Sequence, residues 1–90
     1  MALAQHPSVG RIVHYVLPSH SARAGEIRPA IITQVWTDLD HASSPGMCNL
    51  TVFRDQSNDF AEPGYGPVWA GSVIYSADNA PGTWHWPERV

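Results

Sequence analysis

The chain has 90 residues, a formal net charge of −3 and only 14% charged residues. A chain of this length forms one domain with a thin core, and a weakly charged surface on such a domain predicts a homo-oligomer. The sequence has no lysine and only five arginines, so the basic face that general nucleic-acid binding needs is not expected. No apolar run approaches the roughly 20 residues of a membrane helix, so no membrane association is expected.

The N-terminal part predicts a short arm followed by a strand. Residues 1–8 are expected to be a flexible arm, and residues 9–90 a single β domain. Residues 9–17 are rich in β-branched and aromatic side chains and end at Pro18, which is typical of a strand. Alternation places Arg11, Val13 and Tyr15 on one face. The other face is also largely apolar, so we expect this strand to be covered on both sides for part of its length.

Three further strands follow. Residues 26–37 form the longest predicted strand, and residues 47–54 form the next, in which Cys48 is typical of a small buried hydrophobe. Residues 68–77 form the fourth, where Gly71 indicates a bulge or a bend. The connections are residues 38–46 and the longer segment 55–67, and loops of that length are often functional or mobile.

Residues 81–88 read Pro-Gly-Thr-Trp-His-Trp-Pro-Glu and predict a turn followed by a short fifth strand. Strand alternation places Trp84 and Trp86 on one face and His85 on the other. Two interpretations are open. The indoles either plug the open end of a small barrel or are buried in a subunit interface, or they stack against a planar ligand.

Four or five short strands without any helical periodicity predict an all-β fold. We expect a small antiparallel barrel or strongly curved sheet, SH3-like or OB-like. The alternative is an open sheet that closes only by pairing with another subunit.

Motifs for catalysis are missing from the sequence. The five histidines show no paired spacing, there is no G-x-S-x-G motif, and no glycine-rich loop precedes a helix. The single Cys48 has no neighbouring base. We therefore expect a protein that is not an enzyme and that has no metal, no cofactor and no catalytic residues.

The arginines and tryptophans together predict a binding site for a small anionic ligand. A guanidinium forks onto a phosphate, and an indole stacks a base. His85 would donate a hydrogen bond, and His14 is a weaker candidate. The alternative is that each arginine lies over a tryptophan at a barrel rim and covers it. The predicted ligand-binding residues are Arg11, Arg28, Arg54, Trp84, His85 and Trp86.

Residues 9–17, 28–32, 49–53, 55–59 and 81–88 together resemble a family of small uncharacterised proteins of tailed bacteriophages. The resemblance runs from about residue 9 to residue 90, and its most specific part is the Gly-Thr-Trp-His-Trp-Pro motif at residues 82–87. It implies a viral protein made in the host bacterial cytoplasm, and it carries over no catalytic residues.

Within that class we expect a non-enzymatic accessory protein that binds a nucleotide-like ligand. One such activity is that of a sponge, which sequesters a cyclic nucleotide signal of anti-phage defence. The alternative is a structural or interaction protein, either a virion component or an inhibitor of a host protein.

Overall fold

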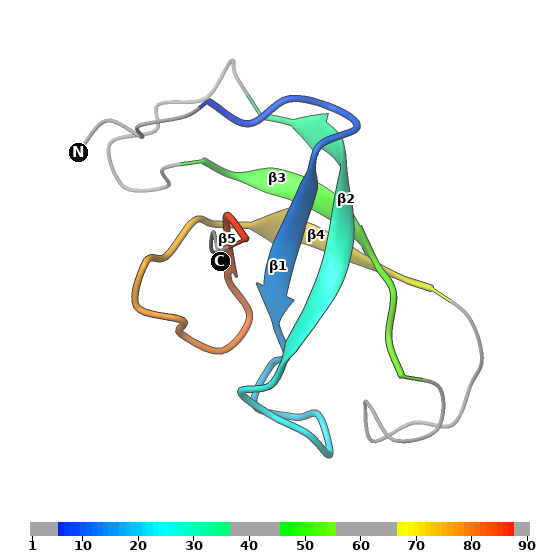
Figure 1. Cartoon of the computed structure of the whole chain (residues 1–90), viewed down its shortest axis with the longest axis vertical. Coiled ribbons are helices and arrows are strands. Elements are labelled where there is room, and N and C mark those ends of the chain that lie inside the picture. The colour runs from blue at the N-terminus through cyan, green and yellow to red at the C-terminus, as the bar shows by residue number, and fades with distance from the viewer. Residues whose placement is uncertain (1–5, 37–45, 56–66, 88–90) are drawn as a thin grey trace.

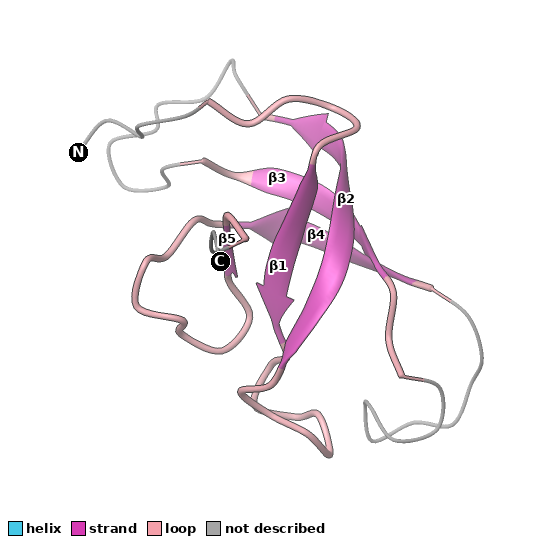
Figure 2. Cartoon of the chain, viewed as in Figure 1, coloured by secondary structure: helices cyan, strands magenta, loops and turns pink. Residues whose placement is uncertain are grey.

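The computed structural model describes residues 6–36, 46–55 and 67–87, and these form one antiparallel sheet of five strands. The strands are β1 (Ile12–Val16), β2 (Ile27–Val35), β3 (Cys48–Val52), β4 (Val68–Val73) and β5 (Trp84–His85). Their order is β4-β3-β2-β1-β5, and the sheet curls into a half-barrel (Figure 1). The described residues include no helix (Figure 2).

The predicted all-β fold is therefore confirmed. β1 to β4 form a meander, and β5 returns to pair with β1. Of the two barrel types expected, this order corresponds to the SH3-like one, because an OB-fold is a Greek-key barrel.

The segment after β4 joins the two edges of the sheet at one end of the half-barrel. The backbone N–H of Trp84 donates to the carbonyl of Ile74 at 3.0 Å, and that of Ser76 donates to the carbonyl of Trp84 at 2.9 Å. Tyr75 thus forms a parallel bridge with Trp84. The wall of the half-barrel is closed here by a single bridge and not by a full strand.

The core lies on the inner face of the curled sheet. Strand alternation aims every second side chain inward, and the register aligns these residues on neighbouring strands. Trp84, with no exposed surface, is the largest of them. The core residues are Val13, Tyr15, Leu17, Ala30, Ile32, Cys48, Leu50, Val52, Val73 and Trp84.

The first four predicted strands are all shorter than expected, and for β1 and β4 the backbone gives the reason. β1 begins at Ile12 because Gly10, with a φ of +92°, forms a turn with Val9. β4 ends at Val73 after a bulge at Gly71 and Ser72, where Ser72 has a φ of +54°. The bulge predicted at Gly71 is therefore confirmed.

The expected N-terminal arm and the two long loops fall mainly outside the description. Residues 1–5, 37–45, 56–66 and 88–90 lie outside the described residues.

Candidate functional site

The C-terminal tryptophans belong to a stack of aromatic rings inside the half-barrel. The ring of Trp84 meets those of Tyr75 and Trp86 edge-on, each at a centroid distance of 5.1 Å. The indole N–H of Trp84 donates to the carbonyl of Gly46 at 2.8 Å. Trp84 has an exposed fraction of 0%, so its ring offers no surface on which a base could stack.

Arg11 covers the outer end of this stack. Its guanidinium carbon lies 4.7 Å from the centroid of the Trp86 ring, within the range of a cation–π contact. The structure thus places Arg11 over a tryptophan at the rim, as the alternative interpretation of the arginines proposed.

His85 points to the opposite face of the sheet, as alternation predicted. It pairs with His14 across β5 and β1, and the two rings meet edge-on at 5.6 Å. His85 is buried and His14 is half-buried. In the described part of the chain, no group of three or more histidine, cysteine or acidic residues could hold a metal ion.

Arg28 lies in the same row as Trp84, because both residues pair with Tyr15. Arg28 pairs with Tyr15 in the β1–β2 ladder and contacts Glu26 at 3.1 Å. The backbone N–H of Phe53 donates to the carbonyl of Pro29, so the next residue, Arg54, lies beside Arg28.

Two of the predicted site residues, Arg11 and Arg28, do not lie side by side. The carbonyl of Arg11 accepts from the N–H of Ile32, which lies four residues beyond Arg28 on the same strand. That separation is about 13 Å along the strand. Arg11 lies over Trp86, whereas Arg28 lies in the row of Trp84 with Tyr15 between them.

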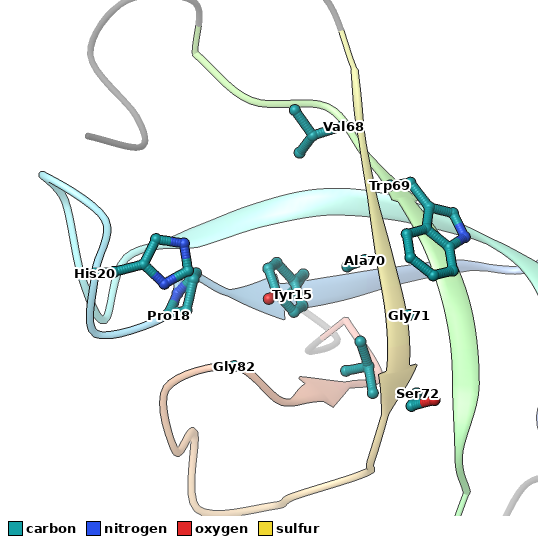
Figure 3. Close-up of a pocket in the computed structure, with 10 residues that line it drawn as sticks. Tyr15, Pro18, His20, Val68, Trp69, Ala70, Gly71, Ser72 and Gly82 are labelled. Atoms are coloured by element: carbon teal, nitrogen blue, oxygen red, sulfur yellow. The ribbon is translucent and has the colours of Figure 1, made fainter. Parts of the chain in front are cut away.

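A pocket that the sequence reasoning missed lies between β4 and the turn that follows β1 (Figure 3). Its volume is about 270 Å³. One wall is the whole of β4, and Tyr15 faces that wall from β1. No local pattern could have revealed it, because it depends on how far β4 stands from β1. Its lining residues are Tyr15, Pro18, His20, Gly82 and residues 68–73.

The outer face of the sheet presents a mainly apolar surface whose residues are exposed or half-buried. One row of paired residues crosses four strands, from Ile12 through Ile31 and Thr51 to Trp69. The exposed fractions are 59% for Ile12, 70% for Trp69 and 43% for Phe53. We call this surface the outer apolar face. It comprises Ile12, His14, Ile27, Pro29, Ile31, Thr51, Phe53 and Trp69.

None of these eight residues carries a formal charge when histidine is neutral. The prediction that β1 is covered on both sides for part of its length is confirmed. On its outer side Val16 is buried, whereas Ile12 is exposed.

Comparison with known proteins finds no relative: no family model, no curated protein and no solved structure matches the chain. The resemblance to a tailed-bacteriophage family therefore remains a prediction. Within the described residues, no helix is long and apolar enough to cross a membrane.

Proposed function

We propose that this protein is not an enzyme and that it acts by binding a protein partner through the outer apolar face. This is the interaction-protein alternative of the sequence analysis, a virion component or an inhibitor of a host protein. The observation that carries the proposal is the uncharged row from Ile12 to Trp69 across four strands. Contiguous exposed apolar surface is typical of interaction sites, and interface cores are poor in charge and rich in aromatic residues.

The geometry of the predicted ligand site favours this function over nucleotide binding. Trp84 is fully buried, and Arg11 covers Trp86. Arg28 lies in the same row as Trp84, with Tyr15 between them, but the Trp84 ring is buried and the Arg28 guanidinium already contacts Glu26.

The test uses charge placed on the outer apolar face. Ile12→Glu and Phe53→Glu each introduce a carboxylate at an exposed position, so the fold should survive. Ala22→Glu adds the same charge at an exposed residue of the turn after β1 and serves as the control. The tagged proteins are used to capture partners from phage-infected host cells, and thermal unfolding checks that each variant is folded.

We expect the wild type and Ala22→Glu to capture the same protein and the two face variants to lose it. Burying an unpaired carboxylate in an interface costs several kcal/mol, so the loss should exceed 100-fold in affinity. Equal capture by all four proteins would contradict the proposal.

A nucleotide-like ligand is the second candidate function, favoured by one observation. Arg28 and Arg54 lie side by side, and Tyr15 is next in the same row. Two neighbouring arginines match the chemistry that forks onto a phosphate. On this hypothesis the protein is a sponge for a cyclic nucleotide of host defence, made in the host cytoplasm.

A thermal-shift screen against mono-, di- and cyclic nucleotides tests it. A ligand at one hundred times its Kd should stabilise the protein by roughly 2.7 kcal/mol. Arg28→Gln should remove the shift, whereas Arg23→Gln, in the turn after β1, should leave it. A flat panel would remove this candidate.

A further inference from the structure

We propose that the pocket beside β4 binds an extended peptide segment, which pairs with the edge of that strand that faces away from β3. The pocket shares only Trp69 with the outer apolar face. Its proposed ligand is a peptide and not a nucleotide.

The first observation is that β4 is an edge strand. It stands at the end of the sheet order and pairs with β3 alone. Among the described residues, no backbone hydrogen bond joins residues 68–73 to any segment other than β3. Alternate residues of an edge strand direct their N–H and C=O groups away from the ladder, where they form a template for another backbone.

The second observation is that this edge borders the pocket. All six residues of β4 line it, and Val68 and Trp69 leave the strand on opposite sides (Figure 3). Pro18, His20 and Gly82 form the opposite wall, and Tyr15 lies between the two walls. A ligand in this pocket therefore runs alongside a strand.

The bulge in β4 explains why the pocket exists. At Gly71 and Ser72 the strand bends, so that the following segment reaches Trp84 and closes one end of the half-barrel. The part of β4 before the bulge has no such partner on this side among the described residues. The result is a gap in the wall of the half-barrel where a further strand would complete it.

The lining chemistry fits a peptide better than an anion. None of the ten lining residues is an arginine, an aspartate or a glutamate. A phosphate would need a cation or a cluster of aligned N–H donors here. The volume of about 270 Å³ is just below the range for drug-sized ligands, which suits a few residues of an extended chain.

β-Strand addition of this kind obtains affinity from main-chain hydrogen bonds and specificity from alternate side chains. Tyr15 and Val68 would meet the inward side chains of the peptide. Such a peptide would be neutral and apolar at those positions, because the core-facing end of the pocket is apolar.

The experiment selects ligands from a library of random linear eight-residue peptides and then measures the affinity of the enriched peptides as synthetic molecules. Each enriched peptide is also made with single N-methyl groups along its backbone. Amide hydrogen exchange of the full-length protein, with and without peptide, locates the site.

We expect N-methylation at alternate positions to weaken binding about tenfold, since each removes one backbone hydrogen bond, and the positions between to have little effect. Exchange should slow in residues 68–73. His20→Ala, in the opposite wall, should weaken binding, whereas Ile12→Glu, on the outer apolar face, should not.

Three outcomes would overturn the proposal: no enriched peptide, binding insensitive to N-methylation, or protection confined to the outer apolar face. Because Ile12→Glu tests the proposed partner surface and His20→Ala tests the pocket, the failure of one proposal is distinguishable from the failure of the other.

Discussion

The side-chain oxygen of Asn49 accepts a hydrogen bond from the backbone N–H of Ser72, 23 residues further along the chain, at 2.9 Å. The same oxygen accepts from the indole N–H of Trp36 at 3.1 Å. Asn49 lies between two irregularities of the sheet, because the register shifts on β2 next to it and on β4 next to it. Its side chain supplies the acceptor that the bulged backbone of β4 lacks.

We predict that Asn49→Ala destabilises the protein by about 2–3 kcal/mol, because two donors lose their acceptor in a region that is mostly shielded from water. Urea unfolding measures the change in free energy. Thr51→Ala, two residues along the same strand, is the control and should cost less than about 1 kcal/mol. Equal costs for the two variants would show that the Asn49 hydrogen bonds contribute no special stability.

The two tryptophans of the C-terminal motif should respond differently to the same substitution. Trp84→Phe loses the hydrogen bond to Gly46 and leaves space in a fully buried site, so we predict a cost of about 2–4 kcal/mol. Trp86→Phe should cost about 1 kcal/mol or less, because the Trp86 indole N–H makes no hydrogen bond within the described residues and the residue is only half-buried. Thermal or urea unfolding of the two variants measures the difference. A larger loss of stability in Trp86→Phe than in Trp84→Phe would contradict the prediction.

Strand alternation was sufficient to predict much of this arrangement. It placed Trp84 and Trp86 on one face, His85 on the other, and Cys48 in the core. A glycine inside a strand was sufficient to predict the bulge at Gly71.

The rest depends on register, which the chain sets only when the strands pair. The separation of Arg11 from Arg28 follows from the β1–β2 ladder, and the role of Asn49 follows from bulges on two other strands. The pocket depends on the distance between β4 and β1, and no local pattern encodes that distance.

Gly71 and Trp69 should be energetically coupled. A Cβ built on Gly71 would overlap the indole ring of Trp69, so Gly71→Ala must push that ring off the strand. We predict a cost of about 1 kcal/mol in the wild type and none, or a slight gain, in a Trp69→Ala background. A double-mutant cycle measured by urea unfolding gives the coupling.

Gly82→Ala is the control for this cycle. Gly82 has a φ of +80°, and a Cβ built on it would meet only Pro18 at an ordinary contact distance, so its substitution is strained for backbone reasons alone. Gly82→Ala should lower the free energy of unfolding by the same amount in the wild type and in the Trp69→Ala variant. A Gly71→Ala cost that persists without Trp69 would show that the strand itself, and not the indole, requires glycine.

Cys48 should make the stability depend on alkaline pH. Burial raises the pKa of its thiol to about 11, from an ordinary value of 9.0. Between these two values the unfolded chain releases the proton while the folded protein keeps it. The stability is therefore fully present below about pH 9 and falls as the pH rises, by about 1.4 kcal/mol for each pH unit up to about pH 11.

Urea unfolding at half-unit steps from pH 8 to 10 measures this slope, and Cys48→Ala should flatten it below pH 10. Above pH 10 some dependence should remain, because burial also raises the pKa of Tyr15. In the native protein at pH 8 the Cys48 thiol should resist a disulfide reagent and should react once urea unfolds the chain, since the thiolate is the reactive form. Rapid labelling without urea would show that the thiol is accessible in the folded protein, and an unchanged slope in Cys48→Ala would show that another group causes the pH dependence.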